Sequence, residues 1–278
     1  MNFRLMTTSD IPAAMRLKEF AGWNQTASDW NRFLAENPEG CFVMEVEGLV
    51  RGSVTTIIYG GHLAWIGMVL VHPEHRGRGI GTRLLERAIN YLDARGVRTT
   101  KLDATPLGLP IYERLGFRRE FEIERWMLQR VRGSPKPQMW NATASEDILK
   151  LDCEVFGANR SSLLRSLAAE AREFTLMKTR YGKVVGYAFG RRGSHADQLG
   201  PWVARDEGTA RKLLAGFLSR STRDRIISDC IKSNPWAQSL VAAQGFEFSR
   251  PLTRMFRGAN DSPGRQTFLG AILGPEFG

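Results

Sequence analysis

The stretch that decides the fold runs from Ala64 to Arg95 and reads AWIGMVLV (64–71), HPEHRGRGIGT (72–82) and RLLERAINYLDAR (83–95). The first eight residues form an apolar run that is typical of a buried strand and stops at Pro73. The last segment carries apolar residues at helical spacing, and Gly96 follows as a stop signal. The sequence therefore predicts a strand, a glycine-rich loop and a helix in direct succession.

The loop between the strand and the helix has the composition of a phosphate site. Gly77, Gly79 and Gly81 let the backbone turn its N–H groups toward one point, where the helix dipole also favours an anion. Arg76 and Arg78 add positive charge beside these glycines. The spacing G-x-G-x-G differs from the dinucleotide fingerprint, and no lysine follows the last glycine as a nucleotide-binding P-loop requires.

The stretch resembles the coenzyme A loop of the GNAT superfamily of N-acetyltransferases, whose pattern is Val-x-Pro-x-x-Arg/Gln-x-x-Gly-x-Gly/Ala. Val71, Pro73, Arg76, Gly79 and Gly81 match this pattern. The resemblance implies acetyl-CoA as cofactor, with its pyrophosphate on the loop and its thioester carbonyl on backbone N–H groups of the strand; the alternative is a purely structural turn. The residues that it assigns to the cofactor are Val69, Leu70, Val71, Arg76, Gly77, Arg78, Gly79, Ile80, Gly81 and Thr82.

Two further residues are candidates for acid–base chemistry. Tyr112 stands in the ending Tyr-x-x-x-Gly-Phe, which is familiar from GNAT enzymes, and the resemblance makes its phenol the proton donor to the departing thiolate. A tyrosine packed in the core is the alternative. Asp103, at the end of the expected strand 99–104, is a candidate general base, although it can equally cap the next segment, and many family members use a chain of water molecules instead.

The acceptor amine is expected near Trp23, Asn24 and Gln25, because the segment between the first two helices borders that pocket in GNAT enzymes. An aromatic face suits an ammonium group, and the two amides offer donors and acceptors. Trp23 as a core anchor is the alternative. We place the other wall of this pocket around Arg160 and Trp202, since ligand pockets favour domain interfaces.

The second half of the chain repeats the landmarks of the first half. Leu84-Leu85 and Gly116-Phe117 correspond to Leu213-Leu214 and Gly245-Phe246 at the same separation. Gly67 and Leu84 are 17 positions apart, whereas Gly200 and Leu213 are 13 apart, so in the second half four residues are missing from where the phosphate loop should be.

We therefore predict an α/β (α+β) protein of two tandem GNAT folds, each a mixed, mainly antiparallel sheet flanked by helices. The predicted division is a catalytic domain at 1–130, a linker at 131–139 and a non-catalytic GNAT-like domain at 140–278.

Composition narrows the class of partner. The chain has 39 Lys and Arg against 29 Asp and Glu, a net charge of +10, but the basic residues are scattered and form no long tract. Three separated cysteines suggest neither a disulfide framework nor a metal site, and no apolar run reaches the length of a membrane span. We expect a cytoplasmic monomer or homodimer that acetylates a small-molecule amine and uses no metal, nucleic acid or membrane. The alternative is a non-catalytic sensor of acyl-CoA or nucleotide, which would not need Tyr112.

Overall fold

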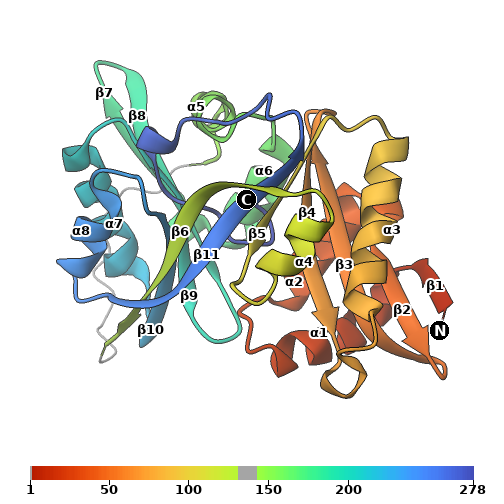
Figure 1. Ribbon diagram of the computed structural model, residues 1–278. Coiled ribbons are helices and arrows are strands. Elements are labelled where there is room, and N and C mark those ends of the chain that lie inside the picture. Colours follow the sequence, from red (N-terminus) through yellow and green to blue (C-terminus); the bar gives the residue numbers. More distant parts are fainter. Residues whose placement is uncertain (1, 131–142) are drawn as a thin grey trace.

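A computed structural model describes residues 2–130 and 143–278, so the predicted linker at 131–139 lies outside the described residues. Within them the strands form a single mixed sheet of twelve strands, with helices packed on it in both halves of the molecule (Figure 1). Neighbouring strands are mainly antiparallel, and the parallel neighbours are β4–β5 and β9–β10. The predicted fold class is confirmed.

The first half follows the order expected from the sequence. Its elements are β1 (Asn2–Leu5), α1 (Ile11–Phe20), α2 (Ala27–Glu36), β2 (Phe42–Val46), β3 (Leu49–Tyr59), β4 (Leu63–Val71), α3 (Ile80–Ala94), β5 (Thr99–Ala104), α4 (Leu109–Arg114) and β6 (Arg118–Gln129). The apolar face predicted for α3 is buried against the sheet, including Leu84, Ala88 and Leu92. This burial fixes the start of α3, and with it the glycine-rich loop, at the end of β4.

The second half repeats this order. Its elements are α5 (Glu146–Phe156), α6 (Ser161–Glu170), β7 (Leu176–Arg180), β8 (Lys183–Arg192), β9 (Asp197–Ala204), α7 (Glu207–Arg220), β10 (Arg225–Ile231), α8 (Ala237–Ala242), β11 (Glu247–Gly258) and β12 (Leu269–Ala271). The pairs β4–β5 and β9–β10 are parallel at corresponding places. From α1 to β6 and from α5 to β11 the two halves therefore share one order of elements; among the described residues, β1 belongs to the first half alone and β12 to the second half alone.

The two halves exchange their closing strands. The strand order is β1-β2-β3-β4-β5-β11-β6-β10-β12-β9-β8-β7, so β11 of the second half lies between β5 and β6. β6 in turn pairs with β10, and Figure 1 shows β6 and β11 crossing the middle of the molecule side by side. The prediction of two tandem folds, each with its own sheet, would place β6 in the sheet of its own half. β6 lies beyond β11 instead, next to β10. The sheet therefore runs continuously from one half of the chain into the other.

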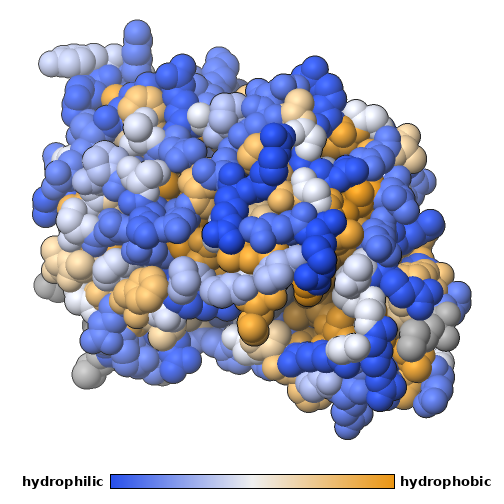
Figure 2. Space-filling view, in the orientation of Figure 1, coloured by the Kyte–Doolittle hydropathy of each residue, from blue (hydrophilic) through white to orange (hydrophobic). Residues whose placement is uncertain are grey.

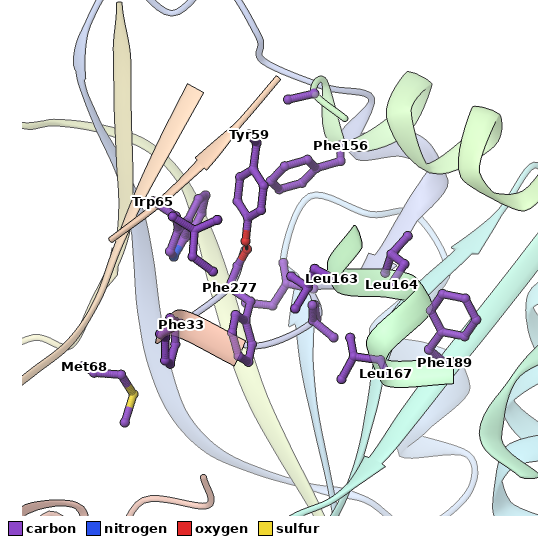
Figure 3. Close-up of a cluster of buried hydrophobic side chains, with 14 of the residues drawn as sticks. Phe33, Tyr59, Trp65, Met68, Phe156, Leu163, Leu164, Leu167, Phe189 and Phe277 are labelled. Atoms are coloured by element: carbon purple, nitrogen blue, oxygen red, sulfur yellow. Dashed lines mark hydrogen bonds between the residues drawn. The ribbon is translucent and has the colours of Figure 1, made fainter. Parts of the chain in front are cut away.

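A shared core joins the halves behind this sheet. Phe33 and Trp65 from the first half lie near Leu163 and Leu167 from the second, and Phe277 lies among them (Figure 3). The Tyr59 hydroxyl donates a hydrogen bond to the Phe277 carbonyl at 2.9 Å, and Trp65 Nε1 donates to the Pro275 carbonyl at 2.9 Å. The segment around Pro275 is thereby fixed against β4, where the site described next is built.

Candidate active site

The site begins where β4 and β5 separate. These parallel strands pair only from Leu63–Thr99 to Trp65–Lys101, although β4 continues to Val71. Met68 has a positive φ of 51°, and the register with β3 shifts between Ser53 and Thr55, so β4 carries a bulge there. The Ser53 hydroxyl donates to the Met68 carbonyl at 2.9 Å and holds the bulge in place. Beyond Trp65, the edge of β4 that faces β5 is therefore left without a strand partner.

A pocket lies at this opening, with about 540 Å³ of space between atoms, part of which is open solvent. It is lined by residues of β4, β5, α4, β6 and β11, of the segment before α2 and of the segment at 275–276. The lining residues are Trp23, Gln25, Ile66, Gly67, Met68, Val69, Leu102, Asp103, Thr105, Tyr112, Arg125, Arg250, Leu252, Pro275 and Glu276. Figure 2 shows hydrophobic side chains in a hollow near the middle of this face, surrounded by polar ones.

The glycine-rich loop lies at the end of β4. Gly77 and Gly79 both have a φ of 74°, and Gly79 is the residue that precedes α3. A Cβ at either position would meet no atom within 4 Å, so the backbone conformation alone favours glycine. Gly81 differs, because its φ is ordinary and a Cβ there would touch only the Val71 side chain at 3.6 Å. The expectation that three equivalent glycines build the loop is therefore corrected to two.

The arginines of the loop are exposed. Arg76 Nε donates to the Val71 carbonyl at 3.2 Å, which folds this side chain back toward the strand. Arg78 is exposed next to Gly79. The loop therefore presents positive charge and solvent-facing backbone at the start of a fifteen-residue helix, which is the arrangement that favours an anion.

The corresponding region of the second half is closed. Asp206 precedes α7 and accepts hydrogen bonds from the Thr209 backbone N–H at 2.8 Å and hydroxyl at 3.0 Å. The opening between β9 and β10 holds β12, which pairs Leu269 with Val203 and Ala271 with Cys230. A carboxylate thus stands where the phosphate loop would be, and the chain's own strand occupies the cleft.

Tyr112 lies on α4 and lines the pocket. Its ring packs edge-on against Phe117, with ring centroids 6.1 Å apart, and its hydroxyl makes no hydrogen bond to any of the described residues. Burial raises the pKa of Tyr112 to about 12. The phenol is therefore protonated at neutral pH and is available as a donor to a ligand.

Asp103 also lines the pocket, but its carboxylate is engaged. Arg254 on β11 donates to both oxygens of Asp103 at 2.9 Å, and its guanidinium lies 4.5 Å from the centre of the Trp65 ring. Burial raises the pKa of Asp103, and the charge and hydrogen bonds of Arg254 oppose that shift. The contacts show a buried ion pair between β5 and β11, the two strands that join the halves.

Of the five residues predicted at the acceptor, Trp23 and Gln25 line the pocket. The Oε1 atom of Gln25 is buried and has no hydrogen-bond partner among the described residues. Trp23 is partly buried, so one part of its indole packs on the core while another faces the pocket. These two positions remain candidates for substrate contact.

The other three do not line the pocket, and their assignment is corrected. Asn24 binds the loop before β9: its Oδ1 accepts from the backbone N–H groups of His195 at 3.0 Å and Ala196 at 2.9 Å. Arg160 is buried and donates to both oxygens of Asp152, at 2.8 and 2.9 Å. Trp202 is fully buried in the core of the second half. Each side chain is satisfied by structural contacts at a distance from the pocket lining.

Three charged lining residues were missed by sequence reasoning: Arg125, Arg250 and Glu276. Arg125 and Arg250 lie on the exchanged strands, so the prediction of two tandem folds with a sheet each brings neither of them to this site. Glu276 Oε1 accepts from Arg191, whereas its Oε2 is buried without a hydrogen-bond partner among the described residues. No spacing signal marks these positions, because they come together only through the strand exchange and the return of the chain at 275–276.

Among the described residues, one group of side chains could hold a metal ion: His72, Glu74 and His75, whose ligand atoms lie within 4.8 Å of one another. These residues form the short turn before the glycine-rich loop, and Glu74 is exposed. The sequence had predicted no metal ligand. Glu74 Oε2 lies 3.9 Å from His72 Nδ1, which is a weak ion-pair distance, and we assign the group no role in the reaction.

Fold and site together define a class of protein: two copies of one α/β unit, one with an open cleft beside a glycine-rich loop and one with that cleft filled. Comparison with known proteins agrees with this class. The profile of the acetyltransferase (GNAT) family matches residues 11–117, and the profile of an acetyltransferase (GNAT) domain matches residues 148–269. An acetyltransferase of Pectobacterium atrosepticum is 36% identical over 100 residues, which cover 34% of this chain and 70% of that protein.

The chain therefore belongs to the GNAT family, carries two GNAT domains in tandem and is an acyltransferase. Among longer matches, the holothin acyltransferase of a Pseudoalteromonas species is 27% identical over 261 residues, or 92% of this chain and 87% of that protein. A Pyrococcus horikoshii structure, described as an acetyltransferase candidate, has a TM-score of 0.83 at 21% identity and covers all of this chain and 95% of its own. That likeness shows the fold alone. In the described part of the chain, no helix has the length and apolar character needed to cross a membrane.

Proposed function

We propose that the protein transfers an acetyl group from acetyl-CoA to the primary amine of a small molecule, and that the first half alone binds the cofactor. The observation that carries this proposal is the contrast between the halves. The opening of β4 from β5 leads from the glycine-rich loop into a pocket containing Tyr112, whereas β12 fills the equivalent opening of the second half. Because β12 fills the cleft of the second half, we assign that half two roles: it packs against the first half and it lines part of the first half's pocket.

The residues of this cleft suit acetyl-CoA. The loop at Gly77–Thr82 would hold the pyrophosphate through backbone N–H groups, with Arg76 and Arg78 supplying charge. Backbone N–H groups among Val69, Leu70 and Val71, on the edge of β4 that has no strand partner, would hold and polarise the acetyl carbonyl. Acetyl-CoA would supply an acetyl thioester, whose carbonyl carbon bonds to the amine nitrogen as the carbon–sulfur bond breaks.

Two proton movements remain for the chain's own side chains. The amine reaches the pocket as an ammonium ion and must lose a proton, and the leaving thiolate must gain one. Tyr112 is placed to donate, because its hydroxyl is protonated and has no other partner among the described residues. For the acceptor of the amine proton, the free Oε2 of Glu276 suits the role better than Asp103, both of whose oxygens bind Arg254.

One relative bears on the choice of acyl donor. The Pseudoalteromonas protein, which aligns with nearly the whole chain, is named holothin acyltransferase. The word acyltransferase in its name makes acyl groups other than acetyl a second possibility for the donor.

A thiol-release assay tests the proposal. The full-length protein is incubated with acetyl-, propionyl- and butyryl-CoA against a panel of small primary amines, and free CoA and acylated amine are both quantified. We expect amine-dependent release of CoA in equal amount to the amide formed. If calorimetry shows that acetyl-CoA binds and no amine in the panel is acylated, the alternative of a non-catalytic acyl-CoA sensor is favoured.

A further inference from the structure

Two arginines face each other across the exchanged strands in the wall of the pocket. Arg250 on β11 is the cross-strand partner of Arg125 on β6, and both line the pocket. Like charges directly opposite each other in a sheet are destabilising. The register of β11 shifts between Phe248 and Arg250, and such a bulge turns the next side chain from its regular direction. Two like charges in this arrangement call for a counter-charge at each arginine.

Only one of the two counter-charges is supplied by the described residues. Asp229 on β10 lies opposite Arg125 and accepts from its Nε at 2.7 Å and its Nη2 at 2.8 Å. Arg250 makes no hydrogen bond or ion pair with any described residue. Burial lowers the pKa of Arg250 and the neighbouring charge of Arg125 lowers it further, while the charge of Asp229 opposes both effects. The guanidinium is therefore partly desolvated, close to a like charge and without a direct partner in the described part of the chain.

The remaining charged groups of the lining do not neutralise Arg250. Both carboxylate oxygens of Asp103 accept hydrogen bonds from Arg254. Glu276 Oε1 accepts from Arg191, which also donates to Asp29 at 2.9 Å. Two acceptors in the lining remain free, Oε1 of Gln25 and Oε2 of Glu276. Among the described residues, the pocket is thus lined by one arginine without a protein partner and by two residues, Gln25 and Glu276, that each carry a buried acceptor atom without a hydrogen bond.

We infer that the acceptor carries a carboxylate as well as its amine, with the carboxylate bound by Arg250 and the ammonium group received by Gln25 and Glu276. A guanidinium matches a carboxylate through two parallel hydrogen bonds, and such charge-assisted pairs are strong when water is excluded. The substrate class is therefore an amino acid or a similar small amino-carboxylate. This inference rests on the proposed function, since it names the acceptor of that same site.

The test compares acceptors that differ only in the carboxylate. L-phenylalanine and 2-phenylethylamine form one such pair, and L-ornithine and putrescine form another. With the full-length protein and acetyl-CoA, kcat/KM should be at least tenfold higher for the amino acid than for its matched amine, in whichever pair is turned over faster. Arg250→Met should remove this preference mainly by raising the KM of the amino acid, and should leave the amine nearly unchanged. Arg257→Met is the matched control, because Arg257 lies on the same strand but pairs with Asp93 outside the pocket.

A binding experiment separates failure of this inference from failure of the proposed function. 3-Phenylpropionate carries the carboxylate without an amine, and its binding in the presence of CoA is measured by calorimetry for wild type, Arg250→Met and Arg257→Met. Binding lost only in Arg250→Met supports the anion site even if no acyl transfer occurs. Equal turnover of both members of each pair, or the same loss for both in Arg250→Met, would overturn the inference while acyl transfer itself stands. Failure of 3-phenylpropionate to bind wild type, together with no preference for amino acids, would overturn it as well.

The effect of Arg250→Met on Tm distinguishes an arginine that binds a ligand from one that stabilises the fold. A guanidinium that is buried for a ligand costs free energy in the free protein, so its replacement by an apolar side chain of similar length should raise Tm or leave it unchanged. A structural arginine would give the reverse result, a lower Tm in Arg250→Met with the acceptor preference kept.

Discussion

At the scale of single residues, Tyr112 is the side chain on which the proposed chemistry depends most. Its hydroxyl reaches the pocket without a hydrogen-bond partner among the described residues, and its pKa of about 12 keeps it protonated well above neutral pH. Tyr112→Phe should lower kcat by about 10²-fold, since general acid catalysis contributes about 10² to 10⁴, and should leave the Kd of acetyl-CoA unchanged. Steady-state kinetics and calorimetry check this. Tyr91→Phe is the matched control, because the Tyr91 hydroxyl donates to Asn37 outside the pocket lining; equal losses in both variants would assign Tyr112 to packing.

Substitutions of Asp103 and Glu276 distinguish which of the two carboxylates is the general base. Asp103→Asn leaves Arg254 without its buried partner and should destabilise the protein by about 3–5 kcal/mol, as breaking buried ion pairs does. If Glu276 takes the amine proton, Glu276→Gln should remove the acidic limb of the pH–rate profile, which is the fall in rate at low pH. The folded fraction of Asp103→Asn should still show this limb. Chemical denaturation and pH–rate profiles measure the two effects. A limb that disappears in Asp103→Asn and persists in Glu276→Gln would return the role to Asp103.

At the scale of elements, the loop between β4 and α3 is the feature that distinguishes the two halves. Gly79→Val should weaken acetyl-CoA binding by at least tenfold, because a β-branched residue at a φ of 74° forces the backbone out of the conformation that presents its N–H groups. Gly182→Val is the matched control. Gly182 has a φ of 75°, also lies in open space, and forms the turn between β7 and β8. Calorimetry that finds the same loss of affinity in both variants would attribute the effect to general destabilisation.

The elements also show what the sequence could and could not predict. The succession of strand, loop and helix from Ala64 to Arg95 is local, so its periodicity and its glycines were enough to place β4, α3 and the loop between them. The exchange of β6 with β11 depends on pairing between segments more than 100 residues apart, and the bulge at Met68 depends on the register of β4 against β3. Neither feature leaves a periodic signal in the sequence. Trp23 and Gln25 were found at the pocket through the resemblance to GNAT enzymes, whereas Arg125, Arg250 and Glu276 were missed because no local pattern marks them. Arg160 and Trp202 were misplaced because their buried partners, Asp152 and the core around Trp236, cannot be inferred from spacing.

At the scale of the whole molecule, the strand exchange makes the two halves depend on each other. A chain ending at Arg130 would lack β11, which pairs with β5, and would leave β6 without β11 and β10. It would also expose the shared core around Phe33 and Trp65. Residues 1–130 expressed alone should therefore show no cooperative unfolding transition, as monitored by circular dichroism with the full chain as reference. A stable folded fragment that binds acetyl-CoA would contradict this expectation.

The central claim is that the molecule holds one cofactor site, built by the first half and opening on a pocket that both halves line. Isothermal titration calorimetry of the full-length protein with acetyl-CoA tests this claim most directly, with Gly79→Val and Gly182→Val measured alongside. We predict one equivalent bound per chain, with binding lost in Gly79→Val and kept in Gly182→Val. Two equivalents per chain, or one equivalent that survives in Gly79→Val and disappears in Gly182→Val, would contradict it.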